Sequence, residues 1–394
     1  MRSGWINVVV AAIVMLATMP GRTQGLGLIT EPLLGDLRLD RVTYATINLW
    51  ATLIGAAICL PIGRVFDTLG LRVTTLVLTL ALAGVVWSMA HLGAGTGVAL
   101  FLLVLATRAI GQSALSIASI TVVGKTFRDR AGLAMGVYAV LLSIGFMLAF
   151  VYVGTQVRVA GWRSAWAQIA YGLVLIGVPA TLFLREPGVA TSEAAAAPAT
   201  GSTLVEALRT PAFWIFGVAT ALFGLVSSGL GLFNQAVLAE RGFPQSVFVT
   251  FLGATAVIAL VGQFGCGWLS LRWPMPRLLA IAMGIYGVAL VLLSAITTMW
   301  QMWIVAVLIG LSGGMITTLF FAVWGQAFGQ AHLGRIQGAA QMLTVLASAV
   351  GPLVFAKGAE ITGSYAPGLW ILAPLVLLVG AAALRLDLPA PPTR

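Results

Sequence analysis

Long apolar stretches alternate with short polar ones along the chain, and this pattern predicts its secondary structure. Each apolar stretch has the roughly 20 residues that an α-helix needs to cross the hydrocarbon core of a bilayer. The pattern therefore predicts an all-α membrane protein with twelve transmembrane helices. They are expected at residues 5–30, 43–66, 72–92, 98–123, 132–155, 164–184, 211–236, 247–270, 278–297, 302–327, 336–357 and 366–386.

One interruption is longer than the others. Residues 186–203 are small, polar and proline-containing, which is typical of a flexible linker, and six predicted helices lie on each side. We therefore expect an N-terminal six-helix bundle at 1–185, a cytoplasmic linker at 186–203 and a C-terminal six-helix bundle at 204–394.

The two halves carry similar short motifs at a nearly constant offset. Gly63-Arg-Val-Phe-Asp67 matches Gly265-Cys-Gly-Trp-Leu269, and Gly124-Lys-Thr-Phe127 matches Gly325-Gln-Ala-Phe328. A fixed offset indicates an internal repeat. Because each repeat has an even number of helices, both point the same way and are related by a pseudo-two-fold axis along the membrane normal. This arrangement favours a binding site between two halves that rock against each other.

Composition supports the membrane class. Hydrophobic residues make up 60% and charged residues 8% of the chain, against about 25% charged residues in soluble domains. Cys59 and Cys266 both lie in apolar segments, which argues against a disulfide framework or a metal cluster. His91 and His332 fall in predicted loops without metal-ligand spacing. No cofactor is expected, and the apolar N-terminus is interpreted as a retained first helix rather than a signal peptide.

The net charge of +10 reflects membrane topology rather than nucleic-acid binding, because the basic residues sit at loop ends and form no single stripe. With both termini in the cytoplasm, Lys and Arg favour the inner side. The predicted inner loops hold Arg64, Arg72, Lys125, Arg128, Arg130, Arg185, Arg209, Arg272, Arg277, Arg335 and Arg385. We expect a multi-pass protein of a bacterial-type cytoplasmic membrane.

Arg22 lies inside the first apolar segment, where a guanidinium costs roughly 2.5–3.5 kcal/mol on insertion scales. Pro20 removes a helix hydrogen bond beside it, and Gly21 loosens the backbone further. A cation next to a weakened helix turn is what an anion site near the midplane of a transporter requires. The alternative is that Arg22 extends to the outer headgroups.

Arg108 falls in the fourth segment at a depth similar to that of Arg22, and Gln112 follows it by one helical turn. Two cations at one depth suggest a shared anion, although Arg108 could instead be a structural arginine bonded to carbonyls. The amides of Gln24, Asn48 and Asn234 could contact a carboxylate, or they could form helix–helix hydrogen bonds. These residues complete the predicted substrate site.

Proton coupling has one weak candidate, Glu31, because apart from acids at helix ends no carboxylate lies inside a predicted helix. Anion exchange, or cotransport in which the substrate carries the proton as its acid form, requires no such residue.

Two motifs resemble the major facilitator superfamily. Residues 63–72 resemble its signature between the second and third helices, and Arg108-Ala-Ile-Gly-Gln-Ser113 resembles its fourth-helix motif. Residues 124–136, Gly351-Pro352 and Phe213-Trp214 resemble its oxalate/formate antiporter and monocarboxylate transporter branch. The eighth helix departs from that branch, because it has only Gln263 where a charged residue is usual.

This resemblance implies two pseudo-symmetric six-helix bundles, alternating access and a monomer. It also implies that a charged cluster latches the inner gate in the outward-open state; the alternative is topogenic charge in a solvated turn. The predicted gating residues are Gly63, Arg64, Asp67, Arg72, Arg128 and Arg130.

The sequence therefore favours a secondary active transporter of a small organic anion, a monocarboxylate or short dicarboxylate, working by proton symport or anion exchange. Its expected partners are that anion, the lipid bilayer and, in symport, protons; an enzyme and nucleic-acid binding are not expected. Two alternatives are an exporter of hydrophobic or drug-like compounds and a membrane sensor without flux.

Overall fold

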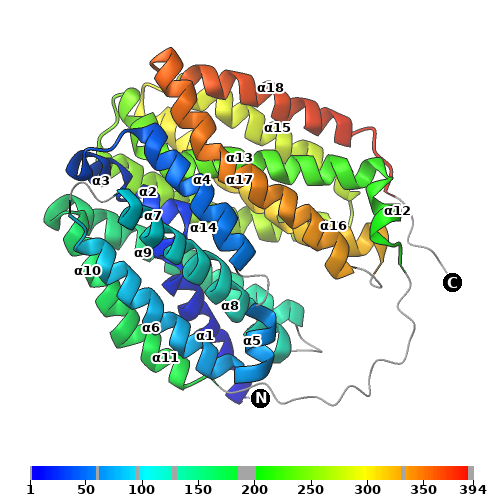
Figure 1. The fold of residues 1–394 in the computed structure, drawn as a ribbon. Helices are drawn as coiled ribbons and strands as arrows, with labels where there is room; N and C mark the ends of the chain where they lie inside the picture. The colour runs from blue at the N-terminus through cyan, green and yellow to red at the C-terminus, as the bar shows by residue number, and fades with distance from the viewer. Residues whose placement is uncertain are drawn as a thin grey trace. The chain divides into compact units, whose positions relative to one another are not determined.

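The computed structural model describes residues 2–58, 62–93, 97–126, 131–184, 201–329 and 333–388 (Figure 1). Within these ranges the regular structure is helical, and the β-structure found is one isolated bridge between Gly201 and Gly329. Eleven candidate spans are long and apolar enough to cross a membrane. The predicted all-α membrane fold is confirmed.

The helices of the first half follow the predicted segments, with several interruptions. They are α1 (Arg2–Ala17), the 3-10 turn η1 (Met19–Gly21), α2 (Thr23–Gly27), α3 (Thr30–Leu37), α4 (Arg41–Ile58), α5 (Ile62–Leu69), α6 (Leu71–Ala90), α7 (Gly97–Ala106), the π-helix η2 (Thr107–Leu115), α8 (Ser116–Thr126), α9 (Ala131–Ala160), α10 (Trp162–Gly172), the π-helix η3 (Leu173–Gly177) and α11 (Val178–Leu182). The predicted second span, 43–66, corresponds to α4 and α5, with residues 59–61 outside the described ranges.

The second half is more regular. It contains α12 (Leu204–Leu208), α13 (Pro211–Glu240), α14 (Gln245–Leu269), α15 (Met275–Leu293), α16 (Met299–Phe328), α17 (Leu333–Thr362) and α18 (Ala366–Ala383). Of the predicted linker, residues 186–200 lie outside the described ranges.

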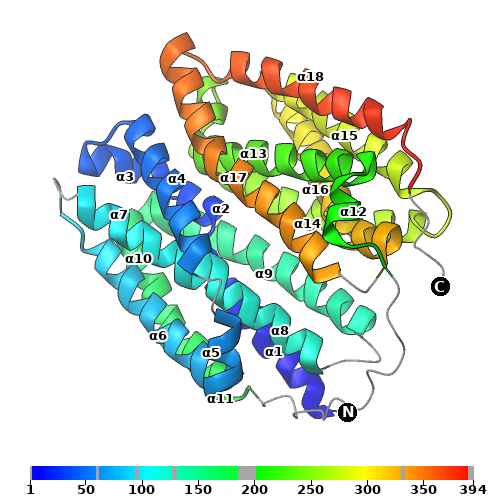
Figure 2. The same cartoon turned by 45° about the vertical axis from the view of Figure 1, so that its right-hand side comes forward.

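The chain divides into two compact units. The first comprises Met1–Val189, Gly231–Ala239 and Phe243–Gly253, and the second comprises Ala190–Leu230, Glu240–Gly242 and Ala254–Arg394. Within the first unit, α1 packs against α8 and α9, and α6 packs against α10 (Figure 2). Within the second, α15 packs between α16 and α18. The last part of α13 and the start of α14 thus group with the first unit, whereas the predicted division placed them in the second bundle.

Large apolar side chains lie both inside and outside each unit. Trp166 and Trp324 are fully buried, whereas Leu175, Leu271 and Ile371 are each more than 60% exposed. Such an apolar exterior is expected for a protein surrounded by lipid. Helices are stable in lipid because they satisfy their backbone hydrogen bonds internally.

Helix crossings in the second unit depend on small residues. A Cβ added to Gly351 on α17 would lie 2.1 Å from the carbonyl oxygen of Leu225 on α13. Only glycine allows two helix backbones to approach this closely. This contact gives a packing reason for the Gly351-Pro352 motif.

Asp40 begins α4 by accepting hydrogen bonds from the backbone N–H of Thr43 at 2.8 Å and from its hydroxyl at 2.6 Å. These bonds favour the ionised carboxylate and lower the pKa of Asp40 below its ordinary value. A carboxylate at this position also complements the positive end of the helix.

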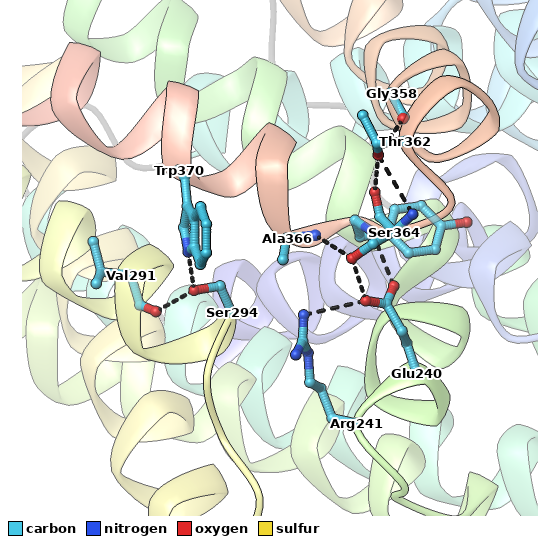
Figure 3. Close-up of polar contacts among 10 residues, drawn as sticks. Glu240, Arg241, Val291, Ser294, Gly358, Thr362, Ser364, Ala366 and Trp370 are labelled. Atoms are coloured by element: carbon cyan, nitrogen blue, oxygen red, sulfur yellow. Dashed lines mark hydrogen bonds and ion pairs between the residues drawn. The ribbon is translucent and has the colours of Figure 1, made fainter.

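Glu240 ties the end of α13 to the turn before α18 (Figure 3). Its carboxylate accepts hydrogen bonds from the hydroxyl of Ser364 at 2.5 Å and from the backbone N–H of Tyr365 at 2.9 Å, and it pairs with Arg241 at 3.1 Å. In the same view, the indole N–H of Trp370 on α18 donates to the hydroxyl of Ser294 at 2.6 Å. Side-chain contacts therefore hold both the turn before α18 and the first turns of α18 itself.

Replacing Glu240 by alanine should lower the thermal unfolding temperature of the purified protein by a few degrees. The change leaves the Tyr365 N–H and the Ser364 hydroxyl without this acceptor. Leaving a buried donor unpaired lowers the free energy of unfolding by about 1–3 kcal/mol, and the loss is smaller here because the Glu240 carboxylate is partly exposed. Glu360→Ala is the matched control, because it removes only an exposed pair with Lys357. Equal unfolding temperatures for the two variants would contradict the anchoring role.

Candidate functional site

The first membrane helix is broken at the depth where the sequence places its cation. α1 ends at Ala17, a single 3-10 turn follows, and Arg22 is extended, with φ −87° and ψ 149°, before α2 begins at Thr23. Pro20 has no N–H to donate, so the α-helical ladder cannot continue through this point. The break turns the side chain of Arg22 back along α1.

Arg22 makes three hydrogen bonds and one ring contact. Its Nε donates to the hydroxyl of Thr18 at 2.7 Å, and its Nη2 donates to the sulfur of Met15 at 2.7 Å and to the hydroxyl of Ser116 at 3.3 Å. The guanidinium carbon lies 5.1 Å from the ring centroid of Phe146, a cation–π distance. The side chain thus lies among α1, α8 and α9 of the first unit.

These contacts argue against extension to the outer headgroups. Thr18 and Met15 precede Arg22 by four and seven residues, so the side chain reaches back by up to about 10 Å toward the N-terminus. The side chain is only half-buried. No carboxylate pairs with it and no acceptor faces its Nη1 among the residues described here. A guanidinium nitrogen is therefore left for a ligand.

Arg108 sits in a different environment, inside the π-helix η2. Its side chain is 2% exposed. Its Nη1 donates to the carbonyl of Gly21 at 3.1 Å, the hydroxyl of Thr23 at 2.9 Å and the amide oxygen of Gln112 at 2.6 Å. Its Nη2 donates to the amide oxygen of Asn48 at 2.8 Å. π-helical turns inside α-helices occur frequently at functional sites.

The predicted residues Gln112 and Asn48 therefore both contact Arg108. Together they hold the break in the first membrane helix, because the carbonyl of Gly21 is one of the bonded acceptors. This arrangement agrees with the alternative of an arginine bonded to a carbonyl. Its charge is balanced by no carboxylate in the part of the chain that is described.

Gly21 packs directly on the π-helix. A Cβ at Gly21 would lie 2.2 Å from the carbonyl oxygen of Thr107 and 2.9 Å from the backbone nitrogen of Gln112. Both neighbours are backbone atoms, so they cannot move aside as a flexible side chain would. The broken turn and the π-helix are thus one packed unit.

Gly21→Ala should destabilise the purified protein by roughly 1–3 kcal/mol, the usual cost of overpacking, and should weaken ligand binding because the acceptor of Arg108 is displaced. Thermal unfolding and ligand titration would measure the two effects. Gly84→Ala on α6 is the control: nothing lies within 4 Å of its Cβ position, so helix propensity makes it neutral or slightly stabilising. If both variants behave alike, the close packing at Gly21 has no importance.

Gln24 and Asn234 are placed by a second close approach within the first unit. A Cβ at Gly27 would lie 1.9 Å from the carbonyl oxygen of Gly231, and a Cβ at Gly231 would lie 3.6 Å from Cγ of Gln24. Asn234 is buried, and its amide oxygen has no hydrogen-bond partner in the described residues. Contact between either amide and a substrate stays a prediction.

Glu31, the weak coupling candidate, forms a partly exposed ion pair with Arg41 at 2.7 Å. Its role in proton coupling stays a prediction. In the predicted gating cluster, Arg72 is exposed near the start of α6. The other five members lie outside what the structure describes, either entirely or in their side chains: Gly63, Arg64, Asp67, Arg128 and Arg130.

Sequence reasoning missed four neighbours of Arg22, namely Met15, Thr18, Ser116 and Phe146. One signal was available: Ser113, Ser116 and Ser119 recur every third residue in the fourth membrane segment, which also carries Arg108 and Gln112. Phe146 gave no signal, because aromatic residues in membrane helices usually serve packing. Among the residues searched, no group of three His, Cys, Asp or Glu side chains could hold a metal ion.

Comparisons with known proteins agree with this architecture. The family model described as Major Facilitator Superfamily matches residues 9–352. A stretch of 125 residues is 30% identical to the tetracycline resistance protein, class E, of Escherichia coli. This stretch makes up 32% of the present chain and 30% of that protein. The chain thus spans less than a third of this curated relative.

Two solved structures share the fold over almost the whole chain. The nucleoside transporter NupG superposes with a TM-score of 0.72 at 15% identity, covering 98% of this chain and 99% of NupG. A bacterial homolog of the human lysosomal transporter Spinster, in an inward-facing and unoccupied conformation, gives 0.70 at 14% identity, covering 97% and 95%. At these identities the likeness concerns the fold alone. Because the family model covers most of the sequence and the helices adopt the same architecture, the chain belongs to the Major Facilitator Superfamily of membrane transporters.

Proposed function

We propose that this transporter moves a small organic anion across the cytoplasmic membrane by alternating access of its two six-helix bundles. The observation that carries the proposal is the side chain of Arg22, which is half-buried at a helix break. Among the described residues, no carboxylate pairs with it and no acceptor faces its Nη1.

The charge balance of the first unit supports an anionic substrate. Arg22 and Arg108 bring two positive charges into the helical interior, and like charges are unfavourable unless a counter-ion or ligand balances them. The described acids of this unit are engaged elsewhere: Glu31 pairs with Arg41, Asp36 pairs with Arg163, and Asp40 caps α4. A bound anion would supply the missing negative charge.

The two arginines divide the work in this proposal. Arg22 contacts the anion directly through its accessible nitrogen. Arg108 contributes its positive field and holds Asn48, Gln112 and the helix break in place. Gln24 and Asn234 are proposed as polar contacts to the remainder of the substrate.

Coupling and topology remain part of the proposal. Anion exchange, or entry of the substrate with its own proton, fits a chain whose only candidate coupling acid, Glu31, is bound to Arg41. We propose cytoplasmic termini, a monomer and an inner gate formed around Asp67. The resemblance to the oxalate/formate and monocarboxylate branch supports the substrate class but not a particular substrate.

A second candidate is an exporter of drug-like compounds, favoured by the local similarity to the tetracycline resistance protein. Lipophilic amines fit this site poorly, because two guanidinium groups would repel a cation. A membrane sensor without flux is a third candidate, and a counterflow measurement on reconstituted protein would exclude it.

A thermal-stability screen of the purified protein tests the proposal. Benzoate, butyrate and succinate should be compared with lipophilic amines and nucleosides at equal concentration. Because a ligand that binds only the folded state stabilises it, at least one carboxylate is expected to raise the unfolding temperature. Stabilisation by amines alone would favour the exporter, and stabilisation by nucleosides alone would also overturn the anion proposal.

A further inference from the structure

The serine and threonine hydroxyl groups near Arg22 differ in whether their protons are already bonded to an acceptor within the protein. Thr18 accepts from Arg22 Nε and donates its proton to the carbonyl of Met15 at 2.6 Å. Ser119 donates to the carbonyl of Ala11 and contacts the hydroxyl of Tyr138, each at 2.6 Å. Both hydroxyl protons are therefore engaged within the protein.

Ser116 is the exception. Its oxygen accepts from Arg22 Nη2 at 3.3 Å, and its proton has no acceptor among the residues that the structure covers. A serine hydroxyl carries one donor, so this donor is available to a ligand. Ser116 is half-buried at the first turn of α8, directly after the π-helix.

Arg22 presents a matching donor. Its Nη2 has two protons, which are directed to Met15 and Ser116, and its Nε proton goes to Thr18. Only Nη1 keeps both protons. Ser116 is bonded to Nη2 of the same guanidinium, so Nη1 and the serine hydroxyl belong to one hydrogen-bonded cluster. Two donors in one such cluster could serve the two oxygens of one carboxylate.

Among the described residues, the contacts of Arg22 include no second charged side chain. One face of the guanidinium is covered by Phe146, which itself stacks on Phe150 with centroids 5.6 Å apart, and Met15 lies at the guanidinium edge. Arg108 is 2% exposed, and both of its Nη atoms are engaged within the protein. One cation is therefore accessible, and it is flanked by apolar groups.

We infer that this site takes a monocarboxylate with an uncharged, apolar remainder, and that Ser116 is a second carboxylate ligand beside Arg22. The inference rests on the proposed transport of an organic anion and narrows its substrate class. A second carboxylate would have to leave water and lie against Phe146 and Met15, which disfavours it. An apolar remainder can instead lie against the half-buried ring of Phe146.

The substrate class is tested by titrating the purified full-length protein with benzoate, butyrate and succinate at about pH 7.5, where every carboxyl is ionised. Benzoate and butyrate are expected to bind at least about tenfold more tightly than succinate. Succinate binding as tightly as benzoate would overturn this inference while leaving the proposed anion transport intact. Failure of all three anions to bind would overturn the proposed function as well.

The role of Ser116 is tested by Ser116→Ala, with Ser116→Thr as the conservative variant that keeps the hydroxyl. Loss of a hydrogen bond to a charged group should weaken benzoate binding about tenfold or more in the alanine variant, and threonine should restore most of it. Ser113→Ala, one turn earlier, is the matched control and should bind like the wild type. Unchanged affinity in Ser116→Ala, with an unchanged unfolding temperature, would show that this hydroxyl is not a ligand.

Discussion

Replacing Arg22 by glutamine is expected to weaken anion binding about 100-fold and to abolish anion uptake. The variant loses the accessible Nη1 donor and a positive charge in the helical interior. A hydrogen bond to a charged group contributes about 1.5–3 kcal/mol, and about 2.7 kcal/mol corresponds to 100-fold in affinity. Uptake into proteoliposomes and benzoate titration would measure the two effects.

The same variant should fold as well as the wild type or better. No described carboxylate pairs with Arg22, and glutamine removes the cost of placing an unpaired guanidinium at membrane depth. An unchanged or raised unfolding temperature, together with lost uptake, would therefore separate binding from stability. Arg22→Lys keeps the charge but loses the planar fork, so it should bind with intermediate affinity. Unchanged uptake in Arg22→Gln would refute the assigned role.

Replacing Arg108 by methionine should have the opposite signature, a lowered unfolding temperature. The change leaves the buried oxygens of Gly21 and Asn48 and the half-buried amide oxygen of Gln112 without their donor. The expected cost is about 1–3 kcal/mol for each buried acceptor and less for Gln112. Relief of the buried charge offsets part of this, so a net loss of about 2–4 kcal/mol is expected. Thermal unfolding in detergent would measure it.

Arg108→Lys distinguishes the hydrogen bonds from the charge. Lysine keeps the cation but cannot present the forked geometry that reaches Asn48 and Gln112 together, so it should recover only part of the stability. Asn48→Ala should lower stability by less than Arg108→Met, because it removes one of the four bonded partners. An unfolding temperature at or above that of the wild type for Arg108→Met would show that this network does not hold the break.

Much of the architecture could be predicted from sequence because lipid imposes strong constraints. A span needs about 20 apolar residues, so eleven of the twelve predicted segments correspond to candidate spans among the described residues, and Pro20 beside Arg22 marked the break in the first helix. The contact between Arg108 and Gln112 could also be predicted, because one helical turn separates them, whereas the contact between Arg108 and Asn48 could not.

The neighbours of Arg22 could not be predicted in the same way. Ser116 and Phe146 lie about 90 and 120 residues further along the chain, and which helix faces the guanidinium depends on helix packing rather than on local pattern. The π-helix η2 changes the phase of the fourth membrane helix between Arg108 and Ser116, so regular 3.6-residue spacing misplaces everything after it. Whether Arg108 is bonded or accessible likewise depends on Gly21 and Asn48, which come from other segments.

The most direct test of the central claim is a cycle that removes charge from the ligand and from the protein in turn. Benzoate and the neutral benzamide would be titrated into the wild type and into Arg22→Gln. If a negative guest is held by this guanidinium, the wild type prefers benzoate by about 100-fold and the variant loses most of that preference. The same preference for benzoate in both proteins would contradict the account, because the charge would then be recognised elsewhere.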